Sequence, residues 1–132
     1  DLNKFKNIND TLGHEAGNVV LKTVATRLKN ILRTSDLTAR YGGDEFVIYL
    51  DSEQAPMTEF LCRHLVDKIV KEIEKPIHVD GKDLEISLSI GIAIYPHAGE
   101  TFTELLKNAD AAMYKAKNDT HHKFYIINAP QD

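Results

Sequence analysis

Two adjacent carboxylates directly follow two glycines in the middle of the chain, at Gly42, Gly43, Asp44 and Glu45. Glycine lets a backbone adopt positive φ and approach a ligand closely, so this tetrapeptide suits a tight turn beside a bound molecule. Carboxylate oxygens suit Mg²⁺, an ion that proteins share with substrate phosphates. Successive strand residues point to opposite faces, so both acids reach one ion only if the turn twists them. The pattern indicates either metal-assisted phosphate chemistry or a simple hairpin with solvated acids.

The neighbouring residues predict the elements that would hold this turn. The runs 37–41 and 45–50 are rich in β-branched and aromatic residues, which predicts a β-hairpin. Segment 84–95 alternates apolar residues with polar or small ones, which predicts one long strand with an apolar face. Shorter strands are predicted at 77–79 and 123–127. Apolar residues at three- and four-residue spacing predict helices over 15–33, 57–75 and 101–118, the last opening on a Thr101–Glu104 capping box.

The order helix, strand, strand, helix, strand, helix, strand predicts an α+β fold. We expect the ferredoxin-like βαββαβ arrangement, with an antiparallel central sheet flanked by helices and with one extra helix and edge strand. That arrangement needs a strand before the first helix, and we expect this strand to lie before Asp1. Residues 1–132 show no repeat, low-complexity tract or linker, which predicts a single domain.

Length and composition exclude several other classes of protein. A chain of 132 residues with 42% hydrophobic residues can bury a core without disulfides or structural metals. The single cysteine, Cys62, excludes an internal disulfide and a multi-cysteine zinc site. No apolar run reaches the roughly 18 residues of a membrane span, and a net charge of -4 argues against a protein that coats nucleic acid. We expect a cytoplasmic domain, whose parent protein could be tethered to a membrane.

Segment 41–46, Tyr-Gly-Gly-Asp-Glu-Phe, resembles the signature of GGDEF-domain diguanylate cyclases. Residues 1–14 are similar to that family's D-x-D-x-F-K-x-x-N-D-x-x-G-H block, and residues 89–93 and 109–117 resemble its two later blocks. The four blocks occur in order over nearly the whole chain, so the sequence is identified as a member of this family. The resemblance implies a nucleotidyl-cyclase palm, which agrees with the predicted βαββαβ order.

The family condenses two GTP molecules into cyclic di-GMP and releases two pyrophosphates. The resemblance therefore implies a diguanylate cyclase, a nucleotidyltransferase that uses Mg²⁺ or, in its place, Mn²⁺. Because the product has two-fold symmetry, catalysis is expected in a homodimer that holds one GTP on each protomer. Asp1 and Asp44 would hold one or two Mg²⁺ ions, with the Leu2 carbonyl as a further ligand. Glu45 would lie beside them as a metal ligand or proton acceptor.

The remaining site residues that the resemblance implies contact the nucleotide. Gly42 and Gly43 would let the backbone pass close to the phosphates, while Lys6 and Lys117 would neutralise the triphosphate. Asn9 matches the family's guanine-contacting asparagine. Taken alone, the lysines could be solvated helix charges, and Asn9 could cap or end a short helix.

Arg33 and Asp36 match the family's R-x-x-D site for product inhibition, a few residues before the glycines. Arginine binds phosphate in a bidentate manner and stacks on guanine, and a carboxylate accepts hydrogen bonds from the guanine edge. Cyclic di-GMP would then be a feedback inhibitor as well as the product. An arginine near a helix C-terminus is also an ordinary partner of the helix dipole, so both interpretations stay open.

Three positions depart from the family pattern. Asn3 stands where a second aspartate is common, with little expected effect. Asn18 replaces an aspartate that reads guanine, and an amide oxygen serves only one of the two guanine donors. His121 replaces a phosphate-binding arginine and is largely neutral at pH 7. Losing the charge-assisted contact to phosphate would cost on the order of 1.5–3 kcal/mol of binding free energy. An active but weakened cyclase is expected.

Two other functions remain open. A domain that binds GTP or cyclic di-GMP without turnover would regulate a neighbouring sensory or EAL-type phosphodiesterase domain, and the residues at positions 18 and 121 favour it. Segment 76–90 also resembles cyclase domains that are fused to an EAL domain. A dimerising scaffold without nucleotide is disfavoured by the complete glycine turn. We further expect the chain to be an N-terminally truncated GGDEF domain, whose missing strand would position Asp1 against Asp44.

Overall fold

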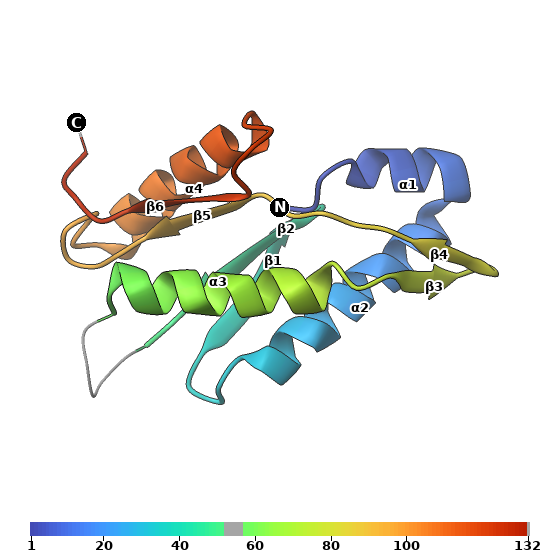
Figure 1. Cartoon of the computed structure of the whole chain (residues 1–132), viewed down its shortest axis with the longest axis horizontal. Coiled ribbons are helices and arrows are strands. Elements are labelled where there is room, and N and C mark those ends of the chain that lie inside the picture. The colour runs from blue at the N-terminus through green and yellow to red at the C-terminus, as the bar shows by residue number, and fades with distance from the viewer. Residues whose placement is uncertain (52–56, 132) are drawn as a thin grey trace. The chain divides into compact units, whose positions relative to one another are not determined.

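The computed structural model describes residues 1–51 and 57–131. Within these ranges the chain packs as two compact units, one drawn from residues 1–51 and 67–88 and the other from 57–66 and 89–131. Helix α3 (Glu59–Ile73) contributes residues to both units. Figure 1 shows the course of the chain through helices and strands, which confirms the predicted α+β class.

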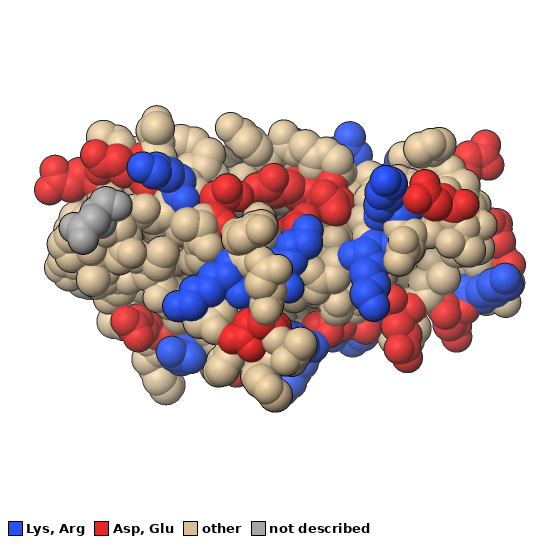
Figure 2. Space-filling view, turned by 90° about the horizontal axis from the view of Figure 1, so that it is seen from above, with Lys and Arg blue, Asp and Glu red and all other residues tan. Residues whose placement is uncertain are grey.

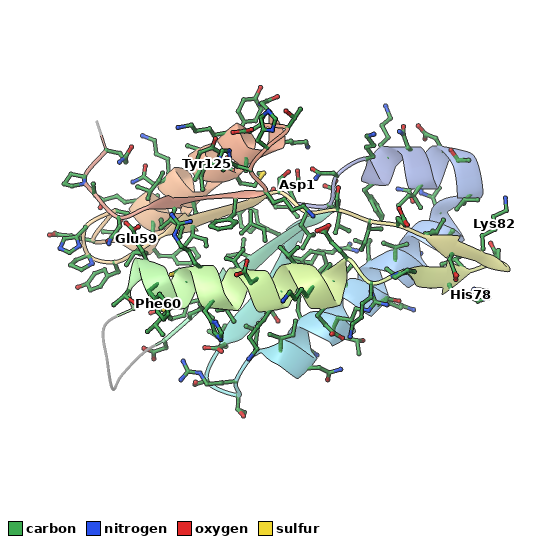
Figure 3. The ribbon with its side chains drawn as sticks, viewed as in Figure 1. Asp1, Glu59, Phe60, His78, Lys82 and Tyr125 are labelled. Carbon is green, nitrogen blue, oxygen red and sulfur yellow. The ribbon has the colours of Figure 1, made fainter. Side chains whose placement is uncertain are left out.

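The first unit holds two helices and two hairpins. Its elements are α1 (Phe5–Leu12), α2 (His14–Ile31), β1 (Leu37–Gly42), β2 (Glu45–Tyr49), β3 (Ile77–Val79) and β4 (Lys82–Leu84). Only Gly13 separates α1 from α2, and its φ of 92° is a conformation that glycine adopts without strain. β1 pairs antiparallel with β2, and β3 pairs antiparallel with β4. His78 and Lys82 lie on the second of these hairpins (Figure 3).

The second unit is a parallel strand pair covered by a helix. β5 (Ile90–Ala93) pairs parallel with β6 (Phe124–Ile127), and α4 (Phe102–Lys117) forms the crossover between them. The predicted cap of α4 is confirmed, because the Thr101 hydroxyl accepts a hydrogen bond from the Glu104 amide at 3.2 Å. The Glu104 carboxylate in turn accepts from the Glu100 amide at 2.9 Å.

Each unit has its own buried apolar residues. In the first unit the buried residues include Leu2, Phe5, Val20, Leu21, Val24, Leu28, Ile69, Ile73, Ile77, Val79, Ile86 and Leu88. In the second they include Cys62, Val66, Ile94, Ala98, Ala112 and Ala116. Burial raises the pKa of the Cys62 thiol, and the nearby Glu59 carboxylate raises it further. This cysteine is therefore a packing residue rather than a reactive thiolate.

One prediction about the elements is wrong, and one element was missed. Segment 84–95 is not one strand, because β4 ends at Leu84 and β5 begins at Ile90. Between them the backbone turns to other partners: the Ser87 carbonyl accepts from the Asn3 amide at 3.0 Å, and Leu88 forms an isolated bridge with Leu2. The helix predicted over 15–33 is confirmed as α2 (His14–Ile31), but the separate helix α1 before it was missed.

The surface carries charges of both signs. On the face that Figure 2 shows, acidic and basic side chains are interspersed rather than gathered into one large patch. No helix in the described part of the chain is long and apolar enough to cross a membrane.

Candidate functional site

The backbone joins the start of the chain to the carboxylate turn. The Leu2 amide donates to the Asp44 carbonyl at 3.2 Å, and Leu2 is 1% exposed. On the other side, Asn3 is held by Ser87 through a backbone hydrogen bond and through a side-chain hydrogen bond at 3.0 Å. The segment that carries Asp1 and the turn that carries Asp44 are thus brought together within one unit.

The glycine turn leaves open space where a ligand would have to approach. Gly43 has a φ of 25°, and the register of the β1–β2 hairpin shifts between Arg40 and Gly42. A Cβ atom built on Gly42 or Gly43 meets no other atom within 4 Å. Asp44 and Glu45 are both half-buried at the start of β2. The predicted hairpin is confirmed, with the carboxylates beside its open tip.

The oxygen donors that this arrangement offers fit Mg²⁺. Asp1, Asp44 and the Leu2 carbonyl would supply hard oxygen ligands, and Mg²⁺ fills its remaining positions with water and substrate phosphates. Among residues 1–51 and 57–131, no three His, Cys, Asp or Glu side chains form a group that could hold a metal ion. Asp1, Asp44 and the Leu2 carbonyl would therefore need further ligands, such as water or phosphate oxygens, to hold such an ion.

Asn9 lies against a glycine of the next helix, and Asn18 is exposed on that same helix. Asn9, on α1, packs its side chain directly against Gly17 on α2, the residue before Asn18. A Cβ atom at Gly17 would collide with the Asn9 side chain and would lie 3.2 Å from Phe5 Cζ. Gly17 thus leaves the space that the Asn9 side chain occupies. We did not identify this role from the sequence, although a glycine inside a helical pattern is a signal for close packing. Lys6, also on α1, is exposed.

Lys117 and His121 belong to the second unit. Lys117 is the last residue of α4, and both side chains are exposed. The Asp119 carboxylate holds the following turn: it accepts from the His121 amide at 2.8 Å, from the Tyr125 hydroxyl, and lies 3.0 Å from His122 Nδ1. These contacts lower the pKa of Asp119, the Tyr125 hydroxyl contributing most.

Tyr125 makes further contacts beside its hydrogen bond to Asp119. Tyr125 lies on β6 (Figure 3), and the Lys115 ammonium lies 4.7 Å from the centre of its ring. The hydrogen bond to Asp119 raises the pKa of the Tyr125 hydroxyl. Asp119 and Tyr125 were not identified from the sequence, because a pair of polar residues six positions apart has no distinctive pattern.

Arg33 and Asp36 form a closed turn after α2. The Arg33 amide donates to the Asp36 carboxylate at 2.9 Å, and the Asp36 amide donates back to the Arg33 carbonyl at 3.0 Å. The Asp36 side chain is 4% exposed, and its buried Oδ1 atom has no hydrogen-bond partner among the described residues. The Arg33 side chain is 65% exposed and donates to the Asp51 carbonyl at 3.3 Å. The pair thus offers an exposed guanidinium beside an unsatisfied acceptor.

Curated relatives carry names from cyclic di-GMP metabolism. The chain is 42% identical over 117 residues to the cyclic di-GMP phosphodiesterase NbdA from Pseudomonas aeruginosa. It is 45% identical over 119 residues to the diguanylate cyclase TpbB from the same species. Both matches cover 89% of this chain but only 14% and 26% of the relatives, so the chain spans a small part of the curated proteins that it matches.

Solved structures and the family match agree with the fold. The crystal structure of the TpbB GGDEF domain superposes with a TM-score of 0.79 at 45% identity, covering 89% of this chain and 71% of that chain. An EAL/GGDEF domain protein from M. capsulatus gives a TM-score of 0.81 at 38% identity, covering 99% and 79%. These neighbours confirm the palm-like α+β fold. Residues 1–123 match the family described as "Diguanylate cyclase, GGDEF domain". The chain belongs to the GGDEF family of diguanylate cyclase domains.

Proposed function

We propose that this GGDEF domain condenses two GTP molecules into cyclic di-GMP and two pyrophosphates, with Mg²⁺ and as a homodimer. The observation that carries the proposal is the hydrogen bond between the Leu2 amide and the Asp44 carbonyl, which brings Asp1 and Leu2 beside the open glycine turn. The Asp1 and Asp44 carboxylates and the Leu2 carbonyl, from two separate parts of the sequence, would then act together as metal ligands. A bound Mg²⁺ would lower the pKa of the attacking 3′-hydroxyl and offset charge at the α-phosphate.

The side chains of this domain would orient the nucleotide around that point. Asn9, which lies against Gly17, and Asn18, which follows Gly17 on α2, would hydrogen-bond the guanine edge. Lys6 would neutralise phosphate charge from α1, and the missing Cβ atoms of Gly42 and Gly43 leave room for the phosphates beside the turn. Glu45 would accept a proton or ligate the metal. Lys117 would contribute a further positive charge from α4.

The same proposal includes an inhibitory site at Arg33 and Asp36. The exposed Arg33 guanidinium would bind a phosphate of cyclic di-GMP, and the Asp36 carboxylate, which is 4% exposed, would accept from the guanine edge once the turn opens.

The direct test incubates the protein that carries this chain with GTP and Mg²⁺ and measures cyclic di-GMP and pyrophosphate. One cyclic di-GMP should form for every two pyrophosphates, and the rate per protomer should rise with protein concentration as the dimer forms. Absence of product at high protein concentration, with GTP still bound, would overturn the cyclase proposal.

A second candidate is a regulatory domain that binds nucleotide without turnover. Asn18 and His121 favour it, because each offers the nucleotide a weaker contact than the family's usual residue. Two similar proteins carry matching names: NbdA is named a phosphodiesterase, and the M. capsulatus protein an EAL/GGDEF domain protein. Calorimetry that shows GTP binding, combined with no cyclic di-GMP in the assay above, would select this candidate.

A further inference from the structure

A small cavity with a basic rim lies between α2 and the β1–β2 hairpin. It has a volume of about 260 Å³ and lies within the first unit. Its apolar lining comes from Leu21, Ala25 and Leu28 on α2 and from Ala39 and Phe46 on the hairpin. Lys22, Lys29 and Arg40 also line it, and no lining residue is acidic. This composition is unusual in a chain whose net charge is -4.

The three cations border the cavity from two elements, two of them from α2 and one from β1. Lys22 and Lys29 are seven residues apart, so they lie on the same face of α2 and are separated by about 10 Å along its axis. Arg40 pairs across the hairpin with Phe46, which places both on one face of the strands. The cations thus border an apolar floor from the helix and from the strands.

None of these cations is neutralised within the described part of the chain. Lys22, Lys29 and Arg40 have neither an ion pair nor a side-chain hydrogen bond to residues 1–51 or 57–131. Arg27, on the same helix, provides the contrast, because its guanidinium donates to the carbonyls of Ile73, Lys75 and Pro76. The only acidic residue of α2 is Glu15, in its first turn.

We infer that this cavity, named here the α2–β1 groove, docks an acidic amphipathic helix of a partner protein. The volume is below the ~300–1,000 Å³ of a typical small-molecule site, and it suits one or two apolar side chains that anchor a helix. A helix lying along α2 would place carboxylates seven residues apart opposite Lys22 and Lys29, with an apolar residue between them entering the groove. A third carboxylate would face Arg40. This inference is independent of cyclase activity.

The test uses a labelled synthetic helix with Glu at positions i and i+7 and Leu at i+4, titrated with the protein and followed by fluorescence anisotropy. Binding should be saturable and should weaken as salt screens the charges. The double substitution K22E/K29E should weaken it about tenfold or more. The matched control K68E/K71E changes the net charge equally on exposed residues of α3 and should leave binding unchanged.

Two further arms identify the occupant. Replacing the peptide Leu by Ser should weaken binding about as much as K22E/K29E, because the apolar floor requires an anchor. Binding that ignores this change, or that an unrelated oligonucleotide reproduces with equal affinity, would make the groove a general polyanion surface and would overturn the inference. An effect of K68E/K71E equal to that of K22E/K29E would overturn it as well. Circular dichroism of each variant should show an unchanged fold.

Discussion

The amide of Leu2 donates to the carbonyl of Asp44 at 3.2 Å, which joins the two segments that carry the proposed metal ligands. Leu2 is nearly fully buried, and its backbone also bridges to Leu88. The position of the half-buried Asp1 is therefore fixed in part by the buried packing and the backbone contacts of its neighbour Leu2. Because this contact is made by backbone atoms, side-chain substitutions at Asp44 should leave it in place.

Asp44→Ala should abolish cyclic di-GMP synthesis while the domain stays folded. Removing a proposed metal ligand should lower the rate by at least about a hundredfold, since even changes behind the ligands cost 10–100-fold. Product formation is measured together with a thermal melt. Asp67→Asn, which alters an exposed acid of α3, serves as the control and should retain full activity. Substantial cyclic di-GMP synthesis by Asp44→Ala would show that Asp44 is not an essential metal ligand.

Asn18→Asp should raise the preference for GTP over ATP. A carboxylate accepts hydrogen bonds from both guanine donors, whereas an amide oxygen serves one of them, and a bond to a charged group is worth about 1.5–3 kcal/mol. The affinity ratio should increase about tenfold in calorimetric titrations. Asn30→Asp places the same charge at another exposed position of α2 and should not change the ratio. An unchanged ratio in Asn18→Asp would separate this residue from guanine binding.

Sequence patterns predicted the elements whose signals are local. The cap of α4, the β1–β2 hairpin and the buried stripe of α2 depend on residues within a few positions of one another, and all three are present. The break inside 84–95 could not be predicted, because apolar alternation continues through it. The β3–β4 ladder stops at Leu84, opposite Ile77, and Ser87 instead contacts Asn3, 84 residues away.

Helix α1 shows a different failure. Phe5, Ile8 and Leu12 have helical spacing, but the segment is short and mostly polar, so its tendency to form a helix is weak. The role of Gly17 likewise depends on tertiary packing, since the sequence shows a glycine in a helix but not the Asn9 side chain against it. The role of such a residue can be recognised only when the position of the helix packed against it is known.

Gly91→Ala should destabilise the second unit strongly. A Cβ atom on Gly91 would collide with the Ala109 carbonyl and the Met113 amide of α4, and backbone atoms cannot move aside as a flexible side chain can. The expected loss is about 3 kcal/mol, the upper range for overpacking. Gly42→Ala is the matched control, because its Cβ atom would meet open space, and it should change stability by less than about 1 kcal/mol. Urea unfolding of both variants compares the two; equal midpoints would contradict the described packing of α4 on β5.

Arg33→Ala should weaken the binding of cyclic di-GMP about tenfold or more, because the exposed guanidinium is the proposed phosphate contact. GTP turnover in the absence of product should persist, since Arg33 is not a proposed metal or substrate contact. Arg63→Ala removes an arginine that lies over the Phe124 ring and should leave cyclic di-GMP affinity intact. If Arg33→Ala binds cyclic di-GMP as well as the parent protein does, the inhibitory site is refuted while the cyclase proposal survives.

Tyr125→Phe should reduce the dependence of stability on acidic pH. The Tyr125 hydroxyl is the largest cause of the lowered pKa of Asp119. A carboxyl whose pKa is lower in the folded state stabilises the fold above its ordinary pKa of about 4, and this stabilisation is lost as pH falls further. Without the hydroxyl, the pKa of Asp119 should move back toward its ordinary value, so less stability remains to be lost. Unfolding midpoints in urea at about pH 7 and about pH 3 measure the difference. Tyr114→Phe, at a tyrosine that is 67% exposed, should keep the parent's pH dependence. If the unfolding midpoint falls equally from about pH 7 to about pH 3 in Tyr125→Phe and in the parent protein, the hydrogen bond to Asp119 does not contribute to the pH dependence of stability.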